Sequence, residues 1–291
     1  MKQRKFAIVT DSGCDLSKDY LKEHDVFCVP LGFTFDGVNY GGDDGETMPT
    51  DEFYERLKKG GMPTTYQATP ESVKGVLEPV LADGKDVLAV SFSSGLSGTE
   101  GSYRLAAKEL SARYPDRQIT VIDSLGASMG HGLLVDYAVK MADTGADLKK
   151  TAKYLDGLKG NIAHVFTVDN LYHLKRGGRV SGMTALIGTV LKIKPLMHVN
   201  DVGKLVAVQK CMGRKKALRA MMERIEQTQA LEKGDPIFIS HGACPEDAVQ
   251  MQRELQEKYP DSPVTVGEIG PVIGTHSGVG TLAVFFKAKQ R

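Results

Sequence analysis

The chain has 291 residues, of which 41% are hydrophobic and 25% are charged, a balance typical of a globular protein with ample material for a core. Lys and Arg number 37 and Asp and Glu 36, so the net charge is +1. This near cancellation argues against a general nucleic-acid-binding protein, which normally has a marked basic excess. The length suits one large domain or two ordinary ones.

Membrane-spanning and secreted classes are also disfavoured. No apolar run approaches the roughly 18 residues that a bilayer-spanning helix needs. The first apolar run, at residues 6–9, is shorter than the roughly 7–15 residues of a secretory signal. Four widely spaced cysteines, Cys14, Cys28, Cys211 and Cys244, form no C-x-x-C pair. We therefore expect a cytoplasmic protein with reduced thiols and neither a disulfide framework nor a zinc site.

Short β-branched runs alternate with helical patterns through the first half of the chain. The expected strands are 6–9, 26–31, 87–92 and 119–122, and the expected helices begin near Ser17, Thr50, Thr69 and Ser97. Between the second strand and the Thr50 helix, Asp36-Gly37 separates two alternating runs and predicts a hairpin. Strand–helix alternation predicts an α/β fold, in which helices cover both faces of a mostly parallel sheet, a three-layer arrangement.

The second half has a different pattern. Two predicted strands, 195–199 and 205–209, flank a short turn at 201–203, which indicates antiparallel pairing and a mixed sheet. The other expected strands are 162–168, 237–240, 264–266 and 282–286; helices are expected at 147–158 and 181–193, around 218–225, and between 240 and 264. We place a domain boundary near residue 160, which divides the chain into an N-terminal α/β domain, 1–160, and a C-terminal α/β domain, 161–291.

Several familiar catalytic signatures are absent. The sequence contains no H-E-x-x-H, no phosphate-binding G-x-x-x-x-G-K-[ST] and no G-x-S-x-G. Residues 278–283, Gly-Val-Gly-Thr-Leu-Ala, fit a loose dinucleotide fingerprint. That motif needs a strand before it and a helix after it, whereas residues 278–283 run into a strand-like segment. We therefore do not expect a dinucleotide site there.

Three small, hydroxyl-rich loops follow predicted strand ends, at 63–67, 91–99 and 123–124. In an open parallel sheet, ligands bind outside the carboxyl ends of the strands. Hydroxyls and free backbone N–H groups at a helix start suit a carboxylate or a phosphate. Each loop alone is equally typical of a turn or helix cap, but three together favour a binding site.

Two loops of the second half are candidates as well. Residues 174–181 place three cations around a Gly-Gly turn, and residues 269–280 are apolar except for one ionisable side chain, His276. Taken alone, the first is typical of a solvated surface loop and the second of a structural histidine.

Six segments together resemble one family. They are Thr10–Leu16 (TDSGCDL), Pro63–Gln67 (PTTYQ), Ser93–Thr99 (SSGLSGT), Leu174–Ser181 (LKRGGRVS), Lys194-Pro195 and Gly270–Gly278 (GPVIGTHSG). They occur in the order seen in the DegV family of bacterial two-domain proteins that bind long-chain fatty acids. The chain departs from the family at Tyr66, commonly Ser, and at Val279, commonly Pro. Tyr66 is expected to narrow the head-group end of the pocket.

The resemblance implies a carrier subunit that performs no catalysis alone and uses no cofactor or metal. The fatty acid would lie between a head-group domain, 1–160, and a domain that closes the acyl pocket, 161–291. Its carboxylate would be held by Thr65, Ser94 and His276, with Arg176 near the pocket entrance. A separate fatty acid kinase would then phosphorylate the carboxylate to an acyl phosphate.

Elementary energetics agree with a buried acyl chain. Burial of a roughly 16-carbon chain contributes about 10 kcal/mol before ordering costs, at about 0.8 kcal/mol per CH₂. The apolar face of the predicted 181–193 helix is a candidate wall or plain domain core; it comprises Met183, Leu186, Ile187, Val190 and Leu191. A buried carboxylate needs donors. Thr65 and Ser94 supply neutral hydrogen bonds, and His276 supplies charge if it is protonated.

Two enzymatic alternatives remain open on the sequence. Asp11, Asp15 and Asp123 could meet at the strand ends and bind Mg²⁺ for phosphoryl transfer, although no nucleotide-binding loop accompanies them. An esterase could use Ser94 or Ser97 with His276, although the nucleophile elbow is missing.

Overall fold

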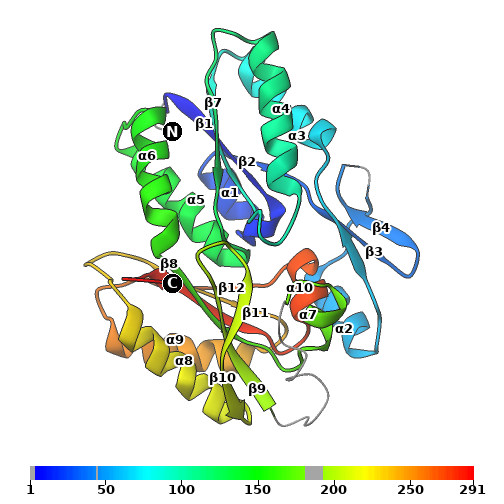
Figure 1. The fold of residues 1–291 in the computed structure, drawn as a ribbon, viewed down its shortest axis with the longest axis vertical. Helices are drawn as coiled ribbons and strands as arrows, with labels where there is room; N and C mark the ends of the chain where they lie inside the picture. The colour runs from blue at the N-terminus through cyan, green and yellow to red at the C-terminus, as the bar shows by residue number, and fades with distance from the viewer. Residues whose placement is uncertain (1–3, 44, 181–192) are drawn as a thin grey trace.

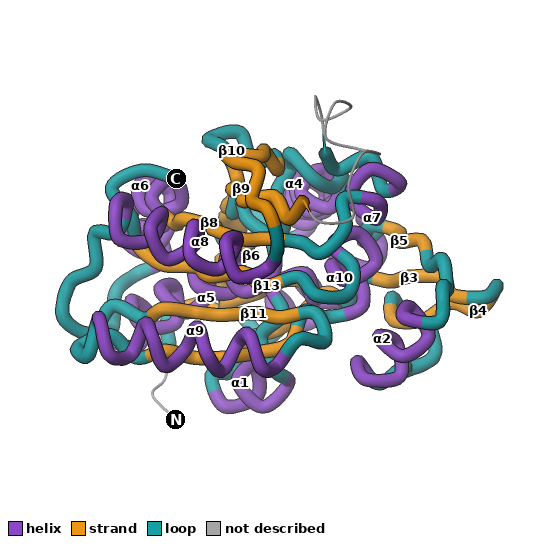
Figure 2. Tube along the Cα trace, turned by 90° about the horizontal axis from the view of Figure 1, so that it is seen from below, coloured by secondary structure: helices purple, strands orange, loops and turns teal. Residues whose placement is uncertain are grey.

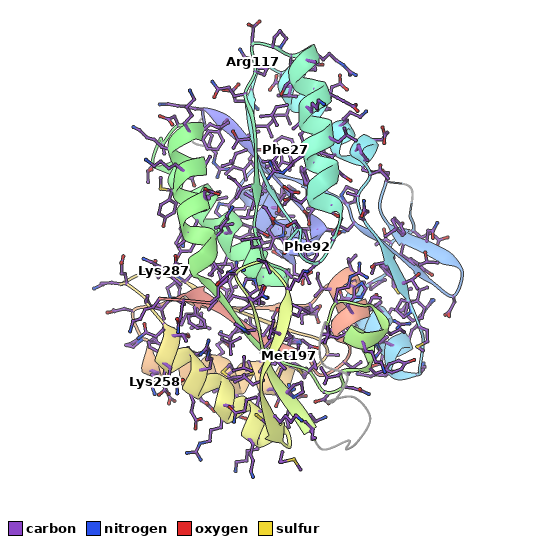
Figure 3. All side chains as sticks on the ribbon, in the orientation of Figure 1. Phe27, Phe92, Arg117, Met197, Lys258 and Lys287 are labelled. Carbon is purple, nitrogen blue, oxygen red and sulfur yellow. The ribbon has the colours of Figure 1, made fainter. Side chains whose placement is uncertain are left out.

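The computed structural model describes residues 4–43, 45–180 and 193–291. The described strands form three sheets. Figure 1 shows α4 (Thr99–Arg113) near the top of the molecule and α9 (Pro245–Lys258) near the bottom. Side chains fill the space between these elements: Phe92 and Met197 lie inside, whereas Arg117, Lys258 and Lys287 extend from the periphery (Figure 3).

The first sheet is parallel, with the order β2-β1-β6-β7. Its strands are β1 (Phe6–Asp11), β2 (Val26–Val29), β6 (Asp86–Ser91) and β7 (Ile119–Asp123). Alternate side chains point to opposite faces: Val9 packs with α3 (Pro70–Ala82) and α4 (Thr99–Arg113), and Ile8 with α5 (Ser128–Asp143) and α6 (Leu148–Leu158). The predicted parallel sheet with helices on both faces is confirmed.

The second sheet is mixed, with the order β10-β9-β8-β13-β11-β12. It comprises β8 (Ile162–Thr167), β9 (Ile193–Val199), β10 (Leu205–Met212), β11 (Ile237–His241), β12 (Val264–Glu268) and β13 (Leu282–Lys287). β11 and β12 pair in parallel, and the other pairs in this sheet are antiparallel. One face packs against α8 (Arg214–Thr228) and α9 (Pro245–Lys258) through residues such as Met221 and Phe286. The predicted mixed sheet is confirmed.

A small third sheet, β4-β3-β5, stands to one side with α2 (Thr50–Lys58), as Figure 2 shows. Its strands are β3 (Gly32–Phe35), β4 (Val38–Gly41) and β5 (Thr64–Tyr66). The predicted hairpin is present, with Asp36 and Gly37 at φ values of 51° and 81°. The 63–67 segment, expected to be a loop at the edge of the parallel sheet, instead contains β5 and pairs with β3. Cross-strand pairing over this distance leaves no local sequence signal.

Helix α5 was not predicted, and it joins the two large sheets. It contacts β1 and β6 of the first sheet and β8, β11 and β13 of the second. Nearly all of its residues are buried, so it lacks the one-sided apolar stripe by which an amphipathic helix is recognised. The two halves therefore share one core around α5, and the division near residue 160 stays a prediction.

Polar side chains cap the starts of three helices. Ser17, Thr69 and Asp147 accept backbone N–H groups at the starts of α1 (Lys18–Glu23), α3 and α6. Short 3₁₀ turns occupy Ser12–Cys14 and Lys159–Asn161. None of the helices in the described ranges is long and apolar enough to cross a bilayer.

Three expectations in the second half need comment. The predicted apolar loop at 269–280 contains a helix, α10 (Pro271–Ser277), and the 174–181 loop begins inside α7 (Tyr172–Arg176). The predicted 181–193 helix lies outside the described residues except for Ile193, which begins β9. Residues 278–283 follow a helix and enter β13, the reverse of the dinucleotide order, as expected.

Candidate functional site

A largely apolar cavity of about 380 Å³ is lined by both halves of the chain, and we refer to it as the apolar cavity. Its volume is within the range of small-molecule sites, about 300–1,000 Å³. Its apolar lining includes Leu31, Phe92, Leu96, Phe166, Val199 and Phe285. The side chains of Phe92 and Leu96 come from the loop after β6, so the end of the parallel sheet forms part of the wall.

Helix α10 extends along one side of this cavity. Val272, Ile273 and His276 line it from one face of the helix, and Ile269, just before α10, lines it as well. A helix of seven residues is about 10 Å long. The apolar cavity therefore extends from the Ile269 end of α10 to the His276 end.

A polar cluster lies at the His276 end. The Thr65 hydroxyl of β5 is 2.7 Å from Nε2 of His276. Burial, together with the positive charges of Arg179 and Arg176, lowers the pKa of His276 from 6.5 to about 4. His276 is therefore neutral near pH 7, and any positive charge beside a ligand must come from another side chain.

The other ring nitrogen of His276 is enclosed. Nδ1 is buried and has no hydrogen-bond partner among the described residues. It faces Gly177, where an added Cβ would come within 2.1 Å of Nδ1. A proton on Nδ1 would be a buried N–H without a partner, which is energetically costly. The geometry therefore favours the tautomer with its proton on Nε2, and this N–H donates to the hydroxyl oxygen of Thr65. The Thr65 hydroxyl hydrogen is then free to donate to a ligand.

The loop after β6 offers a different serine from the one expected. The Ser94 side chain is exposed and is not part of the cavity lining, while its backbone N–H donates to Asp123 at 3.2 Å. Ser97 does line the apolar cavity. Its hydroxyl accepts from the Thr99 N–H at 3.2 Å, at the start of α4. The sequence analysis named Ser97 only as an expected helix start and as an esterase candidate, and Gly98 separates it from α4.

The two arginines of the 174–181 segment have different positions. Arg176 is half-buried outside the cavity lining, and its guanidinium donates to the carbonyls of Pro63, at 2.8 Å, and Thr275, at 3.4 Å. Arg179 lines the apolar cavity and donates to the Leu96 carbonyl at 3.2 Å. The sequence analysis named Arg176 and not Arg179, because nothing local distinguishes two arginines three positions apart.

Tyr66 lies where the apolar cavity meets the surface, since it lines the cavity and is 39% exposed. Its ring covers Gly32, where an added Cβ would come within 2.0 Å of a ring carbon. The phenol oxygen is 3.4 Å from the Tyr40 carbonyl and from the Gly41 carbonyl. The expected narrowing of the pocket by Tyr66 stays a prediction.

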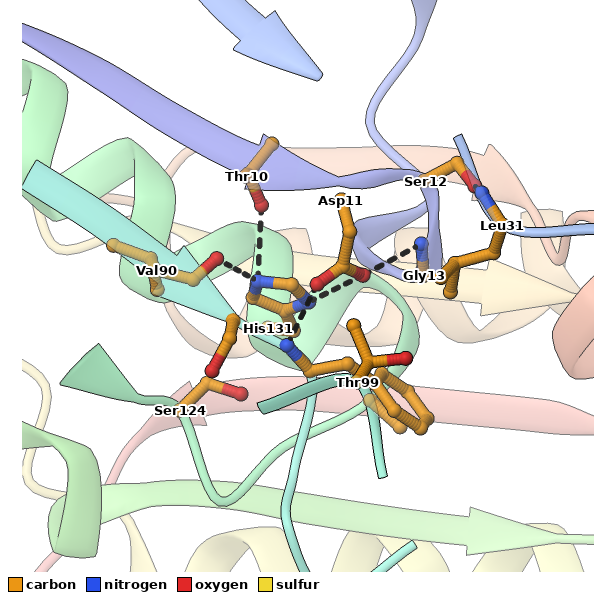
Figure 4. Close-up of polar contacts among 12 residues, drawn as sticks. Thr10, Asp11, Ser12, Gly13, Leu31, Val90, Thr99, Ser124 and His131 are labelled. Carbon is orange, nitrogen blue, oxygen red and sulfur yellow. Dashed lines mark hydrogen bonds and ion pairs between the residues drawn. The ribbon is translucent and has the colours of Figure 1, made fainter. Parts of the chain in front are cut away.

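The three carboxylates of the magnesium alternative are separately engaged. Asp11 accepts from the backbone N–H of Gly13 at 3.1 Å (Figure 4). It also accepts from the N–H of Phe92 at 2.8 Å, and burial raises its pKa. Asp15 accepts from Gly270, and Asp123 from Leu125. Within residues 4–43, 45–180 and 193–291, no group of three His, Cys, Asp or Glu side chains is arranged to hold a metal ion. The geometry gives this alternative no support.

The esterase alternative is similarly unsupported. A nucleophilic serine needs its base within hydrogen-bond reach. Nε2 of His276 is paired with Thr65, and the hydroxyl of Ser97 lies 3.0 Å from that of Thr99. The described part of the chain contains no hydrogen bond between His276 and a serine.

Two buried histidines also went unnoticed in the sequence. His164 lines the apolar cavity, and burial holds its pKa well below the usual value. Its Nδ1 donates to the Ile162 carbonyl at 3.1 Å and its Nε2 accepts from the Ala127 N–H at 3.3 Å, so it is a neutral structural side chain. His131 lies 2.9 Å from the Val90 carbonyl and 3.0 Å from the Thr10 hydroxyl (Figure 4).

Several solved structures with the same overall fold are of proteins described as binding fatty acids. A fatty-acid-binding DegV family protein of Thermus thermophilus is 29% identical, covers 98% of this chain and 100% of its own, and superposes with a TM-score of 0.88. A stearic-acid-binding protein of Eubacterium ventriosum is 26% identical, covers 98% of both chains and has a TM-score of 0.88. The fatty-acid-binding DegV protein of Bacillus subtilis is 28% identical, with coverage of 99% and 100% and a TM-score of 0.84.

Sequence comparisons agree with the structural ones. A DegV domain-containing protein of Clostridium perfringens is 39% identical over 283 residues, 97% of each chain. The family model described as "Uncharacterised protein, DegV family" matches residues 5–289, nearly the whole chain. The motifs, the two large sheets and these matches all agree, and the chain belongs to the DegV family.

Proposed function

We propose that the protein binds a long-chain fatty acid in the apolar cavity and performs no catalysis alone. The observation that supports this most directly is the combination of an apolar cavity with a cluster of donors at one end. A ligand with one long apolar part and one anionic end fits that combination. Fatty-acid binding by the similar proteins of Thermus thermophilus and Bacillus subtilis supports the same conclusion.

The head group would lie beside Thr65, Ser97, His276 and Arg179, all of which line the apolar cavity. A carboxylate removed from water is costly unless it is hydrogen-bonded and, where possible, paired with a charge. Thr65 and Ser97 would donate neutral hydrogen bonds, and His276 would orient Thr65. Arg179 would supply the positive charge that a neutral His276 lacks. Ser97 replaces Ser94 in this proposal, because the Ser94 side chain is exposed.

The acyl chain would extend along α10 from His276 toward Ile269. Each buried CH₂ contributes about 0.8 kcal/mol, so the chain supplies most of the binding free energy and the head group supplies orientation. Val272 and Ile273 of α10 and Phe92 of the facing wall would contact it.

We further propose that the bound carboxylate is presented to a fatty acid kinase, which forms the acyl phosphate. A carboxylate near Tyr66 would lie where the apolar cavity meets the surface, the place at which a kinase could reach it. Arg176, expected at the pocket entrance, would act indirectly: its bonds to Pro63 and Thr275 tie together the segments that contain Thr65 and His276. In this proposal, residues 1–160 and 161–291 remain the head-group and closing domains.

The test is organic extraction of the purified protein followed by mass spectrometry, then titration of the delipidated protein with stearate. We expect a co-purifying fatty acid and saturable binding. Ile273→Trp fills part of the apolar cavity from α10 and should abolish both the co-purifying fatty acid and the binding of stearate. Val249→Trp, at an exposed position of α9, should leave both unchanged. Absence of fatty acid and of stearate binding in the folded wild-type protein would refute the proposal.

A further inference from the structure

The side chain of Asp15 connects three segments that are distant in the sequence. Its Oδ1 accepts from the backbone N–H of Gly270 at 3.1 Å, and its Oδ2 accepts from the Ser128 hydroxyl at 2.5 Å. The Ser128 hydroxyl is also 3.0 Å from that of Ser240 in β11. Gly270 immediately precedes α10, the helix that contains His276. Asp15 therefore fixes the start of α10 to the loop after β1 and to the start of α5.

The approach of Gly270 to this carboxylate is close. A Cβ at Gly270 would lie 2.7 Å from Oδ1 of Asp15, so the backbone can reach the carboxylate because the residue is glycine. The contact is therefore a close-packed part of the fold and not an incidental surface hydrogen bond.

Asp15 also lies between the apolar cavity and a second cleft, of about 680 Å³. Ser128 and Ile269 line the apolar cavity, whereas Asp15 and Gly270 line the second cleft. The half-buried Asp15 can thus exchange a proton through the second cleft without opening the apolar cavity.

We propose that Asp15 is a positioning residue for the ligand site: its ionised carboxylate holds α10 where His276 meets Thr65, and protonation of that carboxylate weakens the hold. The inference rests on the proposed function, because it concerns the affinity of that site for its ligand. It adds a residue at the far end of α10 to those beside the head group.

The physical basis is the difference between charged and neutral hydrogen bonds. An ionised Asp15 accepts two charge-assisted bonds, which are roughly twice as strong as neutral ones. A protonated Asp15 keeps Gly270 as a donor but must turn its own hydroxyl toward Ser128. Burial raises the pKa of Asp15 from 3.8 to about 7, so both forms are populated near neutral pH, whereas the hydrogen bonds from Ser128 and Gly270 act in the opposite direction. Loss of the Gly270 bond from an Asp15 that stays buried would therefore raise the pKa further, so ionisation of Asp15 favours α10 in its place.

Other ionisable groups lie around Asp15, and their effect on the pH dependence must be distinguished from that of Asp15. They are Asp11 and Cys14 of its own segment, Lys18 of α1, Tyr54 of α2, Asp136 and Lys140 of α5, and Glu268 of β12. Burial raises the pKa values of Cys14 and Tyr54 well above their usual range, so both stay protonated between about pH 6 and 8. The Asp15→Asn variant distinguishes Asp15 from the remaining groups, because it removes the titration of Asp15 and leaves the titrations of the other groups in place.

The experiment measures the affinity for dodecanol, an uncharged probe, from about pH 6 to about pH 8. In the wild-type protein we expect the affinity to rise roughly 3- to 10-fold with pH. The affinity of Asp15→Asn for dodecanol should stay at the low-pH value of the wild-type protein across the whole range. Asp147→Asn is the matched control: Asp147 also accepts a backbone N–H at a helix start, at 2.8 Å in α6, and should keep the wild-type rise.

A second measurement does not depend on ligand or variant. Amide-exchange protection of residues 270–277 in the ligand-free wild-type protein, corrected for the intrinsic pH effect, should increase with pH relative to that of α6. The inference would be overturned if the dodecanol affinity of Asp15→Asn rose with pH as in the wild-type protein. It would also be overturned if the protection of residues 270–277 relative to α6 did not change with pH. If neither dodecanol nor fatty acid binds at any pH, the proposed function fails instead, and exchange alone decides whether Asp15 holds α10.

Discussion

Nε2 of His276 lies 2.7 Å from the hydroxyl oxygen of Thr65, although 211 positions separate the two residues. They meet because the small sheet that contains Thr65 packs on α10, with Tyr54 of α2 donating to the Ile269 carbonyl at 2.9 Å. The pair therefore couples the first and last parts of the chain at the candidate head-group site.

His276→Ala should lower fatty-acid affinity roughly 10-fold, because Thr65 loses the group that orients its hydroxyl. His276→Gln retains a donor and should keep part of the affinity. Calorimetric titration and melting temperature are measured on the same samples. Unchanged affinity in a well-folded His276→Ala protein would exclude His276 from the head-group site.

Ser97→Ala should weaken fatty-acid binding by roughly 10-fold, the effect of losing one hydrogen bond to a charged group. Ser94→Ala is the matched control and should bind normally, because the Ser94 side chain is exposed outside the apolar cavity. If Ser94→Ala lost affinity and Ser97→Ala bound normally in the same titration, Ser94 and not Ser97 would contact the head group.

Arg179→Gln should reduce the affinity for a fatty acid more than that for the alcohol of equal length. Arg179 is the cation among the described residues that line the apolar cavity, so its charge matters only for a charged head group. The ratio of the two affinities is measured by competition at constant salt. An equal loss for acid and alcohol would indicate that Arg179 acts through packing alone.

Arg176→Ala should lower fatty-acid affinity because it releases the Pro63 and Thr275 carbonyls and lets Thr65 and His276 separate. Arg176→Lys can satisfy one of these carbonyls and should be intermediate. Lys175→Ala, at the exposed neighbouring position, is the control. If Arg176→Ala binds normally but supports less kinase-dependent acyl phosphate formation, Arg176 contacts the kinase directly.

His276 should also make stability depend on pH. Burial lowers its pKa from the ordinary 6.5 to about 4 in the folded protein. Between these values the unfolded chain binds the proton and the folded protein does not, so the stability from a neutral His276 is lost as pH falls. Urea unfolding should show that wild-type protein loses about 2 kcal/mol more than His276→Gln between about pH 7 and pH 5.

The comparison with His276→Gln is essential, because Asp15 acts in the opposite direction. Relative to the unfolded chain, in which Asp15 is solvated, its raised pKa stabilises the whole fold as pH falls, and the two effects partly cancel in the wild-type protein. Release of α10 alone leaves Asp15 buried and removes only the Gly270 bond, so its pH dependence has the opposite sign. A difference between wild type and His276→Gln that does not change with pH would show that His276 is not desolvated.

Features that depend on neighbours in the sequence were predictable. The Asp36-Gly37 turn needs two positive φ values, which these residues tolerate, and the capping side chains of Ser17 and Thr69 act on N–H groups three positions away. The alternation of strands and helices likewise reflects local periodicity, and it was sufficient to indicate a covered parallel sheet. Thr65 and His276 were identified through resemblance to the family, and both line the apolar cavity.

Features that depend on long-range packing were decided by the tertiary structure. Burial on all sides removed the amphipathic pattern from α5, and strand pairing converted the 63–67 loop into β5. Whether Ser94 or Ser97 lines the apolar cavity depends on which side of the loop faces it. The neutral state of His276 depends on desolvation and two nearby arginines, because a pKa is set by the surroundings that folding creates.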